Sequence, residues 1–174
     1  MKPNWVSFLK HAGKQIAVFA LILIGVGLWQ SRDLPSGKAP VATMSNLTGA
    51  SVEIPDQKRD SVSILYFFAP WCGVCRLSMG HLGDIKRWFP DVEVQAIALD
   101  FESPEDVATF VREVGVAVPV FLGTPQVRDA WRVSAYPTYV IVGADQSIRG
   151  RATSFLICLS KLHSTYFLLM IAWT

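Results

Sequence analysis

Two cysteines stand three positions apart in the stretch "FFAPWCGVCR", directly after an apolar run and a proline. They are Cys72 and Cys75, and the chain of 174 residues has three cysteines in all. Such a pair supports three kinds of chemistry: reversible exchange between dithiol and disulfide, ligation of a metal ion, or closure of a structural disulfide. The remainder of the sequence has to distinguish among them.

The position of Cys72, between a predicted strand and a predicted helix, favours redox chemistry. A helix N-terminus presents unpaired backbone N–H groups and the positive end of the helix dipole. Both lower the pKa of a thiol placed there, and the thiolate is the reactive form. Cys75 lies roughly one helical turn further along the same side, so the two sulfurs can form and break a disulfide.

The other two chemistries have less support in the sequence. A structural zinc site needs a second pair of Cys or His ligands at suitable spacing. The remaining candidates form no paired motif; they are Cys158, His11, His81 and His163. A structural disulfide suits an oxidising compartment, but closing so short a loop removes little chain entropy. We therefore expect a redox pair, with no bound metal and no cofactor.

The elements that must position this pair alternate between strands and helices. A continuous β-branched and aromatic run predicts a strand at 61–69 that is buried on both faces, and 92–99 is predicted as a second buried strand. Apolar residues at helical spacing predict one helix over 72–89, ended by Pro90; they are Val74, Leu77, Leu82, Ile85 and Trp88.

A capped helix is predicted at 103–115, because Ser103 can serve as its N-cap, Pro104 fits its first position and Gly115 can end it. The shorter predicted elements are a hairpin at 47–54, a strand at 118–122, a helix at 124–133 and a hairpin at 138–151. Strands that alternate with helices predict an α/β layered domain.

The start of the chain indicates export. Hydrophobic residues make up 51% of the sequence and mean hydropathy is +0.34. Residues 15–29 form an uncharged apolar run, which is shorter than the ~20 residues of a typical spanning helix, so a cleaved signal peptide is the alternative to an anchor. The bulky and charged "WQSRDLP" that follows offers no small-residue cleavage site, which favours the anchor. Lys2, Lys10 and Lys14 precede the run, so the positive-inside rule exports the remainder.

We therefore expect residues 1–30 to form a cytoplasmic stub and transmembrane anchor (or signal peptide), 31–43 a linker and 44–174 the catalytic domain. In a bacterium this places the protein in the inner membrane as a single-pass protein with its domain in the periplasm. The apolar residues 153–174, which contain Cys158, are expected to form a buried or partner-covered helix or a second span. Lys and Arg are scattered along the chain, which gives no nucleic-acid surface.

The segment "ILYFFAPWCGVC" is similar to the active-site strand and motif of the thioredoxin superfamily, whose usual form is WCGPC. The segment "SAYPTYVIVGADQSIRG" looks like the cis-proline loop of that fold and the strands after it. The order of anchor, hairpin, redox motif, extra βα unit and "VPVF" resembles the TlpA/ResA group of membrane-anchored proteins, and within it the copper-sensitivity-suppressor branch. The resemblance covers about residues 44 to 152 and implies a thioredoxin-like fold with a central mixed sheet flanked by helices.

The resemblance implies roles for residues in two segments. In the motif, Cys72 is the attacking thiolate, Cys75 resolves the mixed disulfide, and Trp71 shields the pair and shapes the docking surface. Gly73 and Val74, between the cysteines, tune the reduction potential.

In the second segment, Pro137 is the cis-proline that lies against the disulfide without an N–H of its own. Tyr136 offers backbone groups to a substrate strand. The sequence departs from the family at Val74, where the common motif has proline, and at Tyr66, where thioredoxin has a buried acid. Proton transfer is therefore left without an assigned group, with Asp100 and Glu102 as candidates.

The function expected from these observations is a membrane-tethered periplasmic thiol:disulfide oxidoreductase. It would exchange disulfides with cysteine-containing proteins, as a reductase, and would need an electron donor or acceptor in the membrane. Two alternatives remain: a copper-binding or copper-tolerance protein that uses Cys72 and Cys75 as soft ligands, and a non-catalytic thioredoxin-like adaptor.

Overall fold

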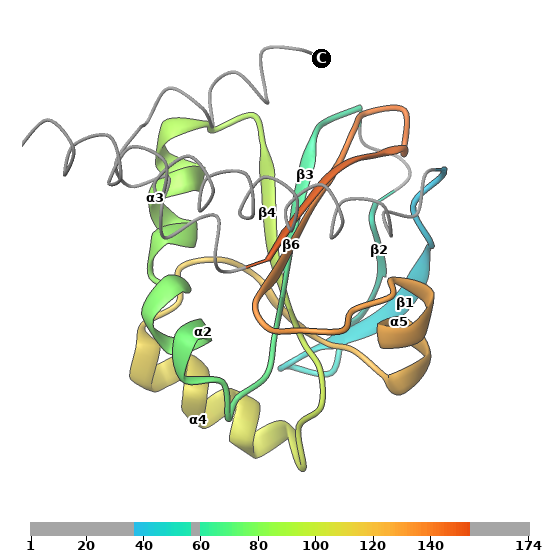
Figure 1. The fold of residues 1–174 in the computed structure, drawn as a ribbon. Coiled ribbons are helices and arrows are strands. Elements are labelled where there is room, and N and C mark those ends of the chain that lie inside the picture. Colours follow the sequence, from blue (N-terminus) through green and yellow to red (C-terminus); the bar gives the residue numbers. More distant parts are fainter. Residues whose placement is uncertain (1–36, 57–59, 154–174) are drawn as a thin grey trace, which may run out of the picture. The chain divides into compact units, whose positions relative to one another are not determined.

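The central strand of the sheet leads directly into the cysteine pair. The computed structural model describes residues 37–56 and 60–153. These residues form a seven-stranded mixed sheet in the order β2-β1-β5-β4-β3-β6-β7, with helices on both faces (Figure 1). The elements are β1 Ala42–Asn46, β2 Ser51–Ile54, β3 Ser63–Phe68, α2 Gly73–Ser78, α3 His81–Trp88, β4 Glu93–Ala98, α4 Pro104–Val114, β5 Val120–Leu122, α5 Pro125–Ala130, β6 Thr138–Val142 and β7 Ile148–Thr153.

The two predicted buried strands are confirmed as β3 and β4. They pair in parallel with each other, β3 pairs antiparallel with β6, and β4 pairs in parallel with β5. All the residues of β3 are buried. A strand with neighbours on both edges and helices over both faces has no exposed side, which explains its uninterrupted apolar sequence.

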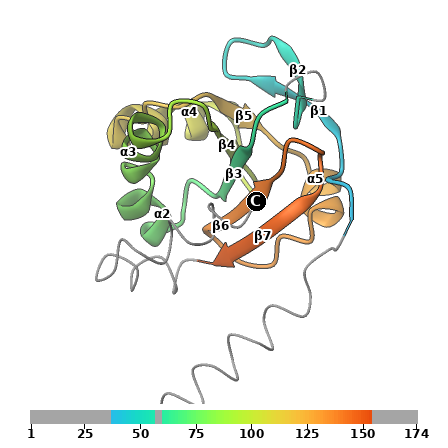
Figure 2. The same ribbon diagram turned by 90° about the horizontal axis from the view of Figure 1, so that it is seen from above.

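The side chains of β3 alternate between two hydrophobic clusters. Tyr66 and Phe68 belong to one cluster together with residues of α2, α3 and α4. Phe67 belongs to the other, which includes Val127 and Trp131 on or next to α5. Figure 2 shows α2, α3 and α4 on one side of the sheet and α5 on the other. This layered arrangement confirms the predicted α/β domain.

The single helix predicted over 72–89 is wrong in one respect, because the structure has two helices, α2 and α3, separated at Met79 and Gly80. The hydroxyl of Ser78 donates to the carbonyl of Val74 at 3.0 Å, a back-bond that tends to bend helices. Gly80 adds a residue of low helix propensity. At the break, the N–H of Leu82 donates to the carbonyl of Met79.

The face that this segment buries also differs from the apolar pattern. Its fully buried or nearly fully buried residues are Cys75, Met79 and Leu82. Three apolar residues that were part of the predicted pattern lie in solvent: Val74, Leu77 and Trp88. Two helical stripes of this segment are apolar, and the one that carries the second cysteine packs on the sheet.

The helix predicted at 103–115 is confirmed as α4, and its ends are those expected. Ser103 and Asp106 form a reciprocal capping box, with bonds of 3.2 and 2.8 Å. Gly115 ends the helix in the left-handed conformation, with φ of 68°. Both predicted hairpins are present, as β1–β2 and β6–β7, but the first strand of β1–β2, Ala42–Asn46, precedes the predicted range of 47–54.

Part of the segment expected as a linker lies on the domain. The backbone of Lys38 pairs with that of Ser147 in an isolated antiparallel β-bridge. Ala39 is buried, and β1 begins at Ala42. The expected anchor in residues 1–30, the apolar segment at the end of the chain and Cys158 lie outside the described residues. Within 37–56 and 60–153, none of the helices combines the length and the apolar character that crossing a membrane requires.

Candidate active site

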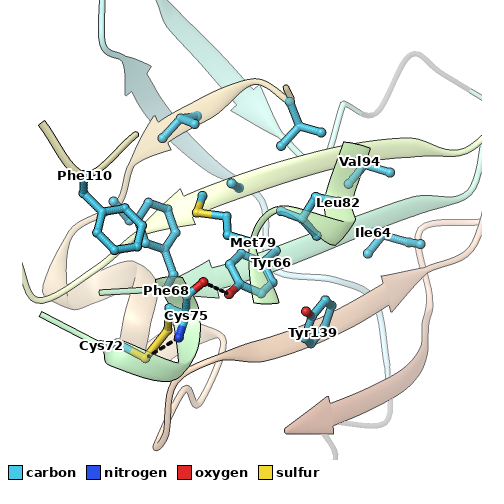
Figure 3. Close-up of a cluster of buried hydrophobic side chains, with 14 of the residues drawn as sticks. Ile64, Tyr66, Phe68, Cys72, Cys75, Met79, Leu82, Val94, Phe110 and Tyr139 are labelled. Atoms are coloured by element: carbon cyan, nitrogen blue, oxygen red, sulfur yellow. Dashed lines mark hydrogen bonds between the residues drawn. A yellow bond between two sulfur atoms is a disulfide. The ribbon is translucent and has the colours of Figure 1, made fainter. Parts of the chain in front are cut away.

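Cys72 and Cys75 form a disulfide, with their Cα atoms 5.2 Å apart. Cys72 lies between β3 and α2, and Cys75 lies in the first turn of α2 (Figure 3). Cys72 retains 7% of its surface exposed, whereas Cys75 has none. Cys72 is therefore the member of the pair that an incoming thiol can reach.

The polar environment of Cys72 is set by the start of α2. Cys72 is the N-cap of this helix, and its Sγ accepts a hydrogen bond from the N–H of Cys75 at 3.1 Å. The first turn of α2 contains no acidic residue that would oppose a negative charge. A thiolate formed at Cys72 would accept the same backbone hydrogen bond, which stabilises the reactive form of the cysteine.

Trp71 lies beside the pair with 69% of its surface exposed. Its indole N–H donates to the backbone carbonyl of Asp100 at 2.8 Å. Its ring contacts that of Tyr136 edge-on, with the ring centroids 5.7 Å apart. The exposed aromatic residue is thus held from two sides, by the loop after β4 and by the loop before β6.

The peptide bond between Tyr136 and Pro137 is cis, as predicted. Pro137 is buried. The hydroxyl of Tyr136 donates to Oδ2 of Asp100 at 2.9 Å, and Oδ1 of Asp100 accepts from Arg128 at 3.0 Å. Partial burial and the neighbouring carboxylate raise the pKa of Tyr136 above its ordinary value, so its phenol stays protonated and can donate.

Asp100 and Arg128 are functional candidates whose contacts the sequence did not reveal. The sequence indicated Asp100 only as a candidate for proton transfer, but both of its carboxylate oxygens bind side chains of other segments. One signal was available: Asp100 follows the buried strand β4, which runs parallel to β3. The ends of parallel strands meet at one edge, so this acid had to lie near the cysteine pair.

Tyr66 is fully buried beneath the first turn of α2. Its hydroxyl donates to the carbonyl of Cys75 at 3.3 Å (Figure 3). The same hydroxyl lies 2.8 Å from the Oγ of Ser78. Burial raises its pKa far above the ordinary value, so the phenol is neutral and cannot act as the buried acid of thioredoxin. Tyr66 is a core aromatic residue with a polar contact to the backbone of Cys75.

The other residues named from the sequence lie around the pair without converging on it. Gly73 and Val74 are exposed, and Leu77, one turn later, is 80% exposed. His81 begins α3, with its Nδ1 3.7 Å from Asp84. In the described part of the chain, no three His, Cys, Asp or Glu side chains are grouped so that they could hold a metal.

Comparison with known proteins agrees with this geometry. The AhpC/TSA family matches residues 35–151. Thioredoxin-like protein YneN of Bacillus subtilis is 24% identical over 138 residues, which cover 72% of this chain and 80% of that protein.

Two solved structures resemble the chain in fold. A Chlorobium tepidum protein described as the thiol:disulfide interchange protein DsbE has a TM-score of 0.63 and 23% identity, over 73% of this chain and 94% of that one. A secreted Mycobacterium tuberculosis disulfide oxidoreductase homologous to DsbE has a TM-score of 0.57 and 19% identity, over 64% of this chain and 82% of that one. These likenesses establish the thioredoxin-like α/β fold.

Proposed function

The chain belongs to the AhpC/TSA family and is a thioredoxin-like thiol:disulfide oxidoreductase with a CxxC active site, and we propose that it reduces disulfides of exported proteins. One observation carries this proposal: the disulfide joins an N-cap cysteine that keeps 7% of its surface exposed, Cys72, to a fully buried one, Cys75. That asymmetry gives the two sulfurs different roles, which a structural bridge does not need.

The proposed exchange has two steps. The Cys72 thiolate attacks one sulfur of a substrate disulfide, a bond forms between Cys72 and the substrate, and the other substrate sulfur leaves as a thiolate that takes up a proton. Cys75 then loses its proton and attacks the Cys72 sulfur, which closes the Cys72–Cys75 disulfide and releases the second substrate thiolate. The substrate gains two electrons, the pair loses two, and a dithiol donor must reduce the pair again.

We propose that Trp71, Tyr136 and Pro137 form the docking surface for the protein substrate. Pro137 presents no N–H toward an approaching chain, and Tyr136 offers backbone groups to an extended substrate segment. The exposed Trp71 ring adds apolar contact area beside Cys72. Gly73 and Val74 would tune the reduction potential through the backbone and the surface between the two sulfurs.

The proposed location is the periplasmic side of the inner membrane, with residues 1–30 as the anchor, as in the TlpA/ResA group. The apolar run at 15–29 and the lysines before it support this location. A tethered domain lies close to a reductant supplied through the membrane, and exported proteins otherwise become oxidised, which is the reason for proposing reduction as the direction.

The experiment combines activity, trapping and the redox state in cells. The reduced full chain should reduce insulin, Cys72→Ser should abolish this activity, and Cys75→Ser should accumulate mixed disulfides with exported proteins. Alkylation of whole cells with a mass-tagged maleimide should find Cys72 and Cys75 mainly reduced. A pair found fully oxidised in cells would reverse the direction, and Cu(I) binding lost in Cys72→Ser without insulin reduction would replace the enzyme by a copper-binding protein.

A further inference from the structure

We propose that Asp100 is a positioning residue that fixes the docking surface and so determines the affinity for protein substrates. The proposal rests on the proposed function, because it assigns a task to the residues around Trp71 and Tyr136. Asp100 acts through the side chains that it binds, which are Trp71, Tyr136 and Arg128.

Asp100 joins three separate segments at the edge of the sheet. Its backbone carbonyl accepts the indole N–H of Trp71 at 2.8 Å. Its carboxylate accepts the hydroxyl of Tyr136 through Oδ2 at 2.9 Å and the guanidinium of Arg128 through Oδ1 at 3.0 Å. One residue therefore connects the cysteine loop, the loop before the cis-proline and α5.

The backbone of Asp100 is specialised for this place. Its φ of 48° lies in the left-handed region, which aspartate and asparagine adopt more readily than other residues with side chains. This turn directs the carbonyl and the carboxylate of the same residue to different partners. A residue that favoured extended backbone would weaken the contacts with both aromatic residues.

Arg128 completes the arrangement. Its guanidinium lies against the carboxylate, with the two side chains 39% and 33% exposed. The contact restricts the rotation of the carboxylate and leaves Oδ2 directed at Tyr136. The two carboxylate oxygens of Asp100 therefore bind different side chains: Oδ1 binds Arg128, and Oδ2 binds Tyr136, the residue before Pro137.

The consequence for binding is preorganisation. Trp71 and Tyr136 come from segments far apart in the chain, and their rings contact each other edge-on at 5.7 Å. A substrate segment that docks on both must find both in place, and ordering them at the moment of binding would lower its affinity. A small disulfide reacts at Cys72 and needs only the sulfur, so it should depend much less on this order.

The test uses Asp100→Asn in the full chain, because asparagine keeps the left-handed backbone and the carbonyl that binds Trp71 but loses the charge. With insulin as substrate, KM should rise by about three- to ten-fold while kcat changes less than about two-fold. With 2-hydroxyethyl disulfide, the second-order rate should change by less than about two-fold. Asp145→Asn is the matched control. Asp145 also binds an arginine, Arg149, at 2.9 Å, but Asp145 lies in the turn between β6 and β7 and does not contact Trp71 or Tyr136 through this ion pair.

Tyr136→Phe removes the hydroxyl that Asp100 binds, so it should raise KM at least as much as Asp100→Asn, and the double variant should be no worse than Tyr136→Phe alone. Arg128→Lys should retain more affinity than Arg128→Gln. If Asp100→Asn does not fold, Tyr136→Phe, Arg128→Lys and Arg128→Gln test the positioning role of Asp100 instead. Equal losses with insulin and the small disulfide, or additive effects in the double variant, would overturn the positioning role and leave the oxidoreductase intact. A wild-type protein inert toward both substrates would instead overturn the proposed function.

Discussion

The buried phenol of Tyr66 predicts that Tyr66→Phe destabilises the protein at neutral pH but not in alkali. The hydroxyl bonds to Ser78 and to the carbonyl of Cys75 inside the core. Ser78 is partly exposed and can bind water instead, and the carbonyl of Cys75 also accepts from the N–H of Met79 at 2.9 Å. The loss should therefore be that of one ordinary buried hydrogen bond, about 0.5–1.5 kcal/mol at pH 8.

Above about pH 10, the difference in unfolding free energy between wild type and Tyr66→Phe should change in the opposite direction. The folded-state pKa of Tyr66 is raised by burial, so the stability that its protonated form contributes is fully present below the unfolded-state pKa, near 10, and is lost as pH rises above it. While the folded phenol stays protonated, wild type loses about 1.4 kcal/mol per pH unit above 10 that the phenylalanine variant does not lose. At pH 11 the deficit should vanish or reverse.

Urea denaturation of the oxidised protein at pH 8 and pH 11 measures this crossing, since the disulfide keeps Cys72 and Cys75 from titrating. Tyr139→Phe provides a second case, because burial raises the pKa of Tyr139 to about 12. A deficit of the same size at both pH values, in either variant, would refute the account of these phenols as buried neutral groups.

Three further predictions follow from the helix ends and the disulfide. In the reduced protein, iodoacetamide should alkylate Cys72 much faster than Cys75, because the second is fully buried; equal rates by mass spectrometry would contradict the assigned roles. Oxidised and reduced forms should differ in unfolding free energy by no more than about 2 kcal/mol, because the loop is short; a much more stable oxidised form in urea titrations would indicate a structural bridge. Ser103→Ala should lower the unfolding free energy by about 1 kcal/mol by urea denaturation, through loss of the capping box with Asp106; no change would mean that this cap does not stabilise α4.

Features that depend on local sequence were predictable. The strand β3 is an almost uninterrupted apolar run, and β4 is apolar apart from Glu93 and Gln95; strands of this composition are buried in the middle of a sheet. The ends of α4 depend on Ser103 and Gly115, whose preferences act within one turn. The cis bond before Pro137 was predictable only through the resemblance to a known fold, since any X-Pro pair reads alike in isolation.

Features that depend on tertiary packing, such as the helix face that lies on the sheet and the contacts between distant segments, were not predictable. The segment from 72 to 89 has apolar residues on more than one helical stripe, and spacing alone cannot tell which stripe packs on the sheet. The structure buries the stripe with Cys75 and Met79 and leaves Leu77 exposed. The bonds of Asp100 to Arg128 and Tyr136 join residues 28 and 36 positions apart, so they follow from strand order and cannot be read from a motif.

The strand order also explains why the candidate site forms where it does. The chain leaves β3 and β4 at the same edge of the sheet, because these strands are parallel, with Phe68 beside Ala98. It enters β6 at that edge, because β6 is antiparallel to β3 and Thr138 pairs with Phe67. Inside the sheet every position of β3 is buried and apolar or nearly so, which excludes charged and reactive groups. The first places where polar groups can converge are the three chain segments at this edge, and these carry the cysteine pair, Asp100 and the cis-proline.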